Sequence, residues 1–95
     1  MSTEILTQKI QPILEKYGAT EAQLFGSFAR GEERPESDVD LVVSLDKPIG
    51  VYRFLEFKEA LEGVLGRSVD LLSKRAINKN LRSFIDRDLV TIYER

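Results

Sequence analysis

The sequence predicts an α/β or α+β fold, with a mixed sheet of about four strands and helices packed mainly on one face. Apolar residues recur at helical spacing in some segments and alternate with polar residues, as in strands, in others. The two kinds of segment follow one another as α-β-α-β-α-β-α-β, the order expected for a sheet covered by helices. The chain has 95 residues, of which 42% are hydrophobic. This is enough for one core, so we expect a single domain over residues 1–95.

Spacing in the first half of the chain predicts a long helix, a strand and a short helix. The apolar face of the long helix comprises Ile5, Leu6, Ile10, Ile13, Leu14 and Tyr17. Gly18 stands at the position of a C-terminal cap, and Pro12 is expected to kink the helix or to restart it. Residues 20–25 predict a short strand and residues 28–30 a short helix. Residues 31–37 have the composition of a turn.

The second half begins with the clearest strand of the sequence, residues 39–45, in which apolar and polar side chains alternate. Helical spacing returns over residues 51–65. Residues 68–72 predict a third strand, residues 77–85 a last helix and residues 89–93 a fourth strand. These segments complete the alternating order of helices and strands.

Two residue types are missing from the sequence, and their absence excludes several kinds of chemistry. Without cysteine there are no disulfides, thiolate nucleophiles, iron–sulfur clusters or cysteine-based zinc sites. Without histidine there are no Ser-His-Asp triads, histidine general bases or HExxH zinc sites. Any bound metal must therefore be held by oxygen ligands, which favours Mg²⁺, Mn²⁺ or Ca²⁺.

The charge pattern is that of an ordinary soluble surface. The 14 Lys and Arg residues and the 16 Asp and Glu residues are interspersed and give a net charge of −2. No basic face for nucleic acid is evident. No apolar run is long enough to span a membrane, and the first residues lack the features of a signal peptide. We therefore expect no stable binding to nucleic acid or to a membrane. The cytoplasm is taken as the default location, and homo-oligomerisation is left open.

Three aspartates are the strongest candidates for chemistry. Asp38 and Asp40 are two residues apart on a strand, so their side chains leave the same face, with Cα atoms about 6.6 Å apart. Their like charges favour a cation between them. Asp70 is flanked by Val69 and Leu71 in the third strand. If these two point into the core, Asp70 points the other way, and pairing of the strands would bring it beside the other two. Three carboxylates on one sheet face predict a site for one or two divalent ions of the kind that acts on phosphoryl groups.

Each of these signals has an ordinary structural explanation when it stands alone. A lone aspartate usually serves solubility or caps a turn. That explanation is weaker for Asp38, Asp40 and Asp70, because each lies in or beside an apolar strand, where aspartate is depleted. The pair Gly26-Ser27 is by itself most often a turn. After a strand, it also lets backbone N–H groups approach a phosphate, with the Ser27 hydroxyl as a further donor.

The combination of these motifs is more specific than its parts. Residues 24–31 (LFGSFARG), followed by residues 37–41 (SDVDL), resemble the signature of the DNA polymerase β-like nucleotidyltransferase superfamily. Within it, they closely resemble the minimal nucleotidyltransferases of the MNT family. The resemblance extends over nearly the whole chain, including the helix after the DxD strand and Asp70. It implies a polymerase β-like nucleotidyltransferase domain.

The resemblance also implies roles for individual residues. Gly26 and Ser27 would hold the triphosphate of the incoming nucleotide. Asp38, Asp40 and Asp70 would be the catalytic residues and would bind the metal. The implied cofactor is Mg²⁺, as one or two ions, with Mn²⁺ as an alternative. Such a site needs no histidine, which agrees with the composition.

MNT proteins typically pair with HEPN-domain toxins, and some members transfer AMP from ATP to a tyrosine of that partner. The resemblance therefore implies a Mg²⁺-dependent nucleotidyltransferase that acts as an antitoxin by modifying a hydroxyl of a HEPN toxin. Two alternatives remain. One is a non-catalytic antitoxin that neutralises its partner by occlusion, against which the retention of Asp70 argues. The other is nucleotidyl transfer to a small molecule or an RNA end, and the acid-leaning charge makes RNA the poorer choice.

Other charged and aromatic residues near the motif are expected to have structural roles. Arg30 either reaches a phosphate or pairs with Glu32 or Glu36, and ion pairing is the commoner fate of a surface arginine. Lys74 and Arg75 follow the third strand, and a solvated surface position is expected for both. The tyrosines are expected in the core or on the surface and not stacked on a base, namely Tyr17, Tyr52 and Tyr93.

Overall fold

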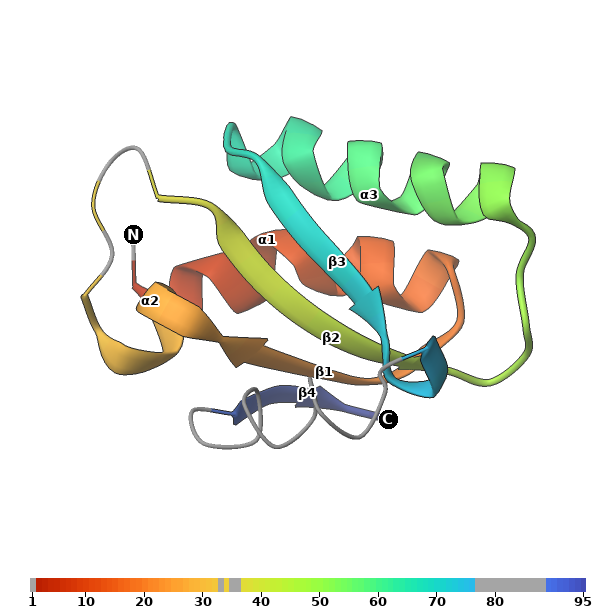
Figure 1. Cartoon of the computed structure of the whole chain (residues 1–95), viewed down its shortest axis with the longest axis horizontal. Coiled ribbons are helices and arrows are strands. Elements are labelled where there is room, and N and C mark those ends of the chain that lie inside the picture. Colours follow the sequence, from red (N-terminus) through yellow and green to blue (C-terminus); the bar gives the residue numbers. More distant parts are fainter. Residues whose placement is uncertain (1, 33, 35–36, 77–88) are drawn as a thin grey trace.

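A computed structural model describes residues 2–32, 34, 37–76 and 89–95 of the chain. In chain order, the elements are α1 (Thr3–Lys16), β1 (Ala19–Phe25), α2 (Gly26–Arg30), β2 (Val39–Leu45), α3 (Val51–Leu65), β3 (Val69–Ser73), the 3₁₀ turn η1 (Lys74–Ala76) and β4 (Val90–Glu94). The strands form a four-stranded sheet in the order β3-β2-β1-β4 (Figure 1). β1 is antiparallel to β2 and β4, and β2 is parallel to β3.

This arrangement confirms the predicted α+β class and the mixed sheet. The third and fourth strands begin one residue later than the spacing indicated, and α2 begins two residues earlier, at Gly26. The helix predicted over residues 77–85 lies outside the residues that the structure describes. None of the described helices is both long enough and apolar enough to cross a membrane.

Helix α1 continues through Pro12 as one element, so of the two expected outcomes the helix does not restart there, and the kink stays a prediction. The Ser2 hydroxyl caps the helix by accepting a hydrogen bond from the backbone N–H of Ile5 at 3.2 Å. A proline removes the N–H that would bond to the carbonyl four residues earlier, which here belongs to Gln8. Pro12 and Gln8 are both exposed, so water can satisfy that carbonyl.

The core lies between the sheet and the helices α1 and α3, which cover the same face (Figure 1). Each helix buries one stripe, made of Leu6, Ile10 and Leu14 in α1 and of Phe57, Leu61 and Leu65 in α3. From β2, Val39, Leu41 and Val43 point into this core. The intervening residues of the strands point to the opposite face, which we call the polar face and which carries Glu21, Gln23, Asp40, Ser44 and Asp70.

Candidate active site

The end of β1 lies beside the start of β2, and this brings Gly26 against Asp40. Phe25 pairs with Asp40 in the antiparallel ladder, so Gly26 turns into α2 next to that carboxylate. Gly26 has a φ of +72°, which side chains other than hydrogen rarely allow. A methyl group at this position would also collide with a carboxylate oxygen of Asp40. The Gly-Ser pair and the DxD motif are therefore in direct contact, and the contact requires glycine.

Asp40 also lies opposite Asp70 on the neighbouring parallel strand. The register of β2 and β3 pairs these two residues directly, and adjacent strands are about 4.8 Å apart. The backbone N–H of Val39 donates to the carbonyl of Ser68 at 2.9 Å, which ties the starts of both strands together. Asp38 precedes β2 and is exposed, as is Asp70. Across the sheet, the order is therefore Gly26, then Asp40, then Asp70.

The charges of the three aspartates act on one another. Partial burial raises the pKa of Asp40 above its ordinary value, and the negative charges of Asp70 and Asp38 raise it further. The positive charge of Arg30 acts in the opposite direction. A partly buried carboxylate that is surrounded by like charges is typical of a site that binds positive charge or moves a proton.

Arg67, which precedes β3, contacts both Phe28 of α2 and the backbone of Arg34. The Arg67 guanidinium carbon lies 5.2 Å from the centre of the Phe28 ring, and its Nη1 donates to the carbonyl of Arg34 at 3.0 Å. The backbone N–H of Arg34 in turn donates to the Ser37 hydroxyl at 2.8 Å. These contacts join α2 to the residues that lead into Asp38. Sequence reasoning missed Arg67, because only the packing of β3 beside β2 brings it to Phe28.

Several residues near the motif take the structural positions that were expected. Arg30 Nε lies 3.1 Å from Glu32 Oε2, an exposed ion pair that contributes little to stability. Tyr17 is buried and stacks on a core ring, Tyr52 is 90% exposed and Tyr93 packs partly buried against the core. None of these observations assigns a tyrosine to a nucleotide base.

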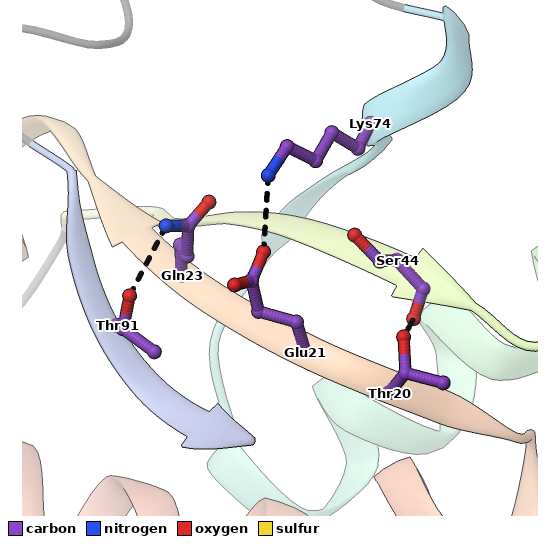
Figure 2. Close-up of polar contacts among 6 residues, drawn as sticks. All are labelled: Thr20, Glu21, Gln23, Ser44, Lys74 and Thr91. Atoms are coloured by element: carbon purple, nitrogen blue, oxygen red, sulfur yellow. Dashed lines mark hydrogen bonds and ion pairs between the residues drawn. The ribbon is translucent and has the colours of Figure 1, made fainter. Parts of the chain in front are cut away.

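Polar contacts extend along the polar face beyond the aspartates. Figure 2 shows Lys74 Nζ donating to Glu21 Oε1 at 3.2 Å, Gln23 Nε2 donating to Thr91 Oγ1 at 3.1 Å and the Thr20 hydroxyl donating to the Ser44 carbonyl at 3.3 Å. Lys74 is thus partly buried and paired, whereas a solvated position was expected; Arg75 is exposed as expected. The alternation of Glu21 and Gln23 with apolar neighbours along β1 was a signal that could have placed them on the same face of the sheet as Asp40.

The sequence and the fold of the chain can now be compared with known proteins. The chain matches the family model "Polymerase beta, Nucleotidyltransferase" over residues 8–95, which include the Gly-Ser pair and all three aspartates. The chain belongs to this nucleotidyltransferase family. It is therefore a nucleotidyltransferase with a polymerase β-like fold, as the resemblance of its motifs implied.

Individual relatives place this nucleotidyltransferase among the small members of the family. Protein adenylyltransferase MntA of Thermococcus cleftensis is 34% identical over 88 residues, which cover 93% of this chain and 89% of that protein. The solved structure of a proposed minimal nucleotidyltransferase is 34% identical, with a TM-score of 0.78 and coverage of 95% of both chains. A toxin–antitoxin structure with AMP-PNP superposes with a TM-score of 0.82. At 22% identity, over 94% of this chain and 73% of that one, it shows a shared fold alone.

Nucleotidyltransferases of this family generally use divalent metals, and the donor set of this chain fits such an ion. Its candidate ligands are carboxylates only, the chemistry that Mg²⁺ prefers. The raised pKa of Asp40 means that a cation beside Asp70 and Asp38 would relieve repulsion. Within residues 2–32, 34, 37–76 and 89–95, however, no three acidic side chains converge as a ready-made cage. The identity of the metal and the three-carboxylate site stay predictions.

Proposed function

We propose that this nucleotidyltransferase moves AMP from ATP to a hydroxyl of a partner protein, with Mg²⁺ as cofactor. We propose further that the partner is a HEPN-domain toxin, that the hydroxyl belongs to a tyrosine and that the transfer makes this chain an antitoxin. The relative that is named a protein adenylyltransferase supports this, because it is 34% identical over nearly the full length of both chains. A toxin–antitoxin structure with the same fold holds AMP-PNP, an ATP analogue.

The observation that carries the proposal is the row of Gly26, Asp40 and Asp70 across three adjoining elements. Gly26 leaves backbone N–H groups open to phosphate oxygens. No hydrogen bond among the described residues occupies the hydroxyl of the half-buried Ser27, so it can serve as a further donor. The triphosphate would therefore lie on the β1 side of Asp40. The acceptor would then approach from the other side, where Asp70 stands on β3.

In the proposed reaction, the acceptor oxygen forms a bond to the α-phosphorus of ATP. The bond from this phosphorus to the oxygen that bridges to the β-phosphate breaks, and pyrophosphate leaves. The hydroxyl proton passes to a carboxylate oxygen of Asp70, which is exposed and faces the acceptor side. Asp40, which is packed against Gly26, would hold the metal ion next to the phosphates.

Mg²⁺ would be held by Asp38, Asp40 and Asp70. When bound, it supplies positive charge that lowers the pKa of the attacking hydroxyl and stabilises the charge on the phosphates. The described residues around these aspartates leave Asp38 and Asp70 exposed. An acceptor as large as a protein side chain therefore has access to them.

The direct experiment mixes the purified chain, ATP radiolabelled at the α-phosphate, Mg²⁺ and a HEPN-domain protein encoded beside its gene. We expect label on the HEPN protein, located on a tyrosine by mass spectrometry and absent when Mg²⁺ is chelated. The double variant Asp38→Asn, Asp40→Asn is the control and should transfer no label.

Two results would contradict the proposal. A chain that circular dichroism shows to be folded but that leaves the HEPN protein unlabelled would count against AMP transfer. A double variant that still neutralises the toxin in cells as well as the wild type would favour occlusion without catalysis.

A further inference from the structure

The carboxyl ends of β2 and β3 border a surface groove, which lies away from the aspartates at the other ends of these strands. Two adjoining clefts of about 320 Å³ each form it, and both are lined by Ile49, Phe54 and Ser73. We call this the α3–β3 groove. β3 is an edge strand of the sheet, so the groove opens at the border of the molecule.

One half of the α3–β3 groove is apolar. It is lined by Val51 and Leu55 of α3 and by Leu71, Leu72 and Ala76. Val51 is 75% exposed and Leu55 is 47% exposed, although both are large aliphatic side chains. Exposed aliphatic side chains that adjoin a cleft are typical of an interaction site.

The other half of the groove is basic. Lys47, Lys74 and Arg75 line it, and its described lining residues include no carboxylate. Lys74 pairs with Glu21, but Lys47 and Arg75 form no ion pair with any described residue. The chain as a whole has a net charge of −2. These three basic side chains next to the apolar half therefore give the groove a charge opposite in sign to the net charge of the chain, and they fit an acidic occupant.

We propose that the α3–β3 groove docks the acceptor protein through a segment that carries both apolar and acidic side chains. The proposal rests on the proposed function, in which a protein hydroxyl approaches Asp70 from the β3 side. Ser44 borders the groove four residues beyond Asp40 on β2. At about 3.3 Å per residue, Ser44 lies about 13 Å along β2 from Asp40, and on β3 the groove begins at Leu71, next to Asp70 in the chain. A partner that fills the groove can thus present a side chain to Asp70 at the same time.

Charge and position argue for a protein segment in the groove and against the nucleotide. The base and ribose of ATP carry no negative charge, so they would leave Lys47 and Arg75 unmatched. The negatively charged triphosphate is expected at Gly26, on the opposite side of Asp40 from β3. An apolar segment with flanking carboxylates satisfies both halves of the groove.

The experiment compares three forms of the full chain: the double variant Lys47→Glu, Arg75→Glu, the single variant Val51→Asp, and the control Lys9→Glu on the exposed surface of α1. The dissociation constant for the HEPN partner is measured without ATP, at low and at high ionic strength. The KM for the partner in AMP transfer and the affinity for ATP with Mg²⁺ are measured as well. All the substituted side chains are exposed, so each variant should fold.

Both groove variants should raise the dissociation constant and the KM for the partner about tenfold or more, with ATP affinity unchanged. The control should stay within about twofold of the wild type. Weaker partner binding by the groove variants supports docking in the groove even where no AMP is transferred, so the proposed function can fail separately. Wild-type partner affinity in both groove variants overturns the docking proposal. A change in self-association or in RNA binding with unchanged partner affinity also overturns it, in favour of a second copy or of RNA.

Discussion

The two faces of the sheet are built from alternate residues of the same strands, yet they differ in charge and in the burial of most of their side chains. Toward α1 and α3, β2 presents Val39, Leu41 and Val43, all fully buried or nearly so. Toward the polar face, the same strand presents Asp40, which is packed against Gly26, and Ser44. The side-chain period of two lets one strand contribute to stability and to chemistry without conflict.

The comparison also shows what each face contributes in energy. Burial of apolar side chains between helices and sheet is the main favourable contribution to folding. The clustered carboxylates of the polar face act in the opposite direction, because burial and like charges disfavour ionised Asp40. A change on one face should therefore alter stability, and a change on the other should alter activity.

The largest expected effect is on the rate of AMP transfer when Asp40 loses its charge. Asp40→Asn should slow transfer about 10³-fold, because the carboxylate beside Gly26 and Asp70 that would hold the divalent metal at the reacting phosphates is lost. Asp46→Asn is the matched control, since Asp46 follows the same strand and pairs with exposed Arg95 at 3.2 Å. It should change the rate by about twofold at most. Equal losses in both variants would contradict the division between the faces.

The next largest effect is on stability, at the helix-covered face. Leu61→Ala should lower the free energy of unfolding by about 2–5 kcal/mol, because Leu61 is fully buried against the sheet. Leu55→Ala is the same substitution on the same helix at a side chain that is 47% exposed, and it should cost about 0.5 kcal/mol. Urea unfolding measures both. A loss of stability for Leu55→Ala as large as that for Leu61→Ala would contradict the assignment of Leu61, and not Leu55, to the core.

A smaller effect separates two glycines with the same backbone conformation. Gly26 and Gly31 have φ values of +72° and +71°, so alanine at either position costs a similar backbone strain, about 1–2 kcal/mol. Only at Gly26 does the added methyl collide with Asp40, and at Gly31 nothing lies nearby. Gly26→Ala should slow transfer about 10- to 100-fold, while Gly31→Ala should stay near the wild type. Steady-state assays of AMP transfer by both variants measure this difference, and thermal melts confirm that both variants fold. Equal transfer rates in the two variants would contradict the prediction.

The smallest effect is a dependence of stability on pH in the absence of metal. The folded-state pKa of Asp40 is raised above its ordinary 3.8 by burial, Asp70 and Asp38, with Arg30 opposing. Its contribution to stability is therefore full below that ordinary value and is lost as the pH rises through the raised folded-state pKa. Asp40→Asn should remove this loss and melt at a higher temperature than the wild type near neutral pH. Calorimetric melts that show a lower melting temperature for Asp40→Asn would contradict the sign.

Much of the fold and of the site followed from local sequence patterns. Alternation along residues 39–45 predicted the strand that carries Asp40, and the flanking apolar residues predicted the face of Asp70. The contact of Gly26 with Asp40 could not be predicted from spacing, because it depends on the antiparallel register that pairs Phe25 with Asp40. Helix α1 can continue through Pro12 because water can reach the exposed carbonyl of Gln8. The spacing of apolar residues indicates only approximately which residues of the helix are exposed.

The remaining features depend on contacts between distant segments. The α3–β3 groove exists because η1 and the start of α3 border the same end of the sheet. Lys47 and Arg75 are 28 positions apart in the sequence, so no local pattern indicated that they line the same groove. Arg67 reaches Phe28 for the same reason.

The central proposal is that Gly26, Asp40 and Asp70 form the site where this nucleotidyltransferase binds ATP together with a divalent metal. Isothermal titration calorimetry of ATP into the wild type, with and without Mg²⁺, and into Asp40→Asn tests it most directly. The account predicts saturable binding that needs Mg²⁺ and that is lost in the variant. Equal ATP affinity in all three titrations would contradict it.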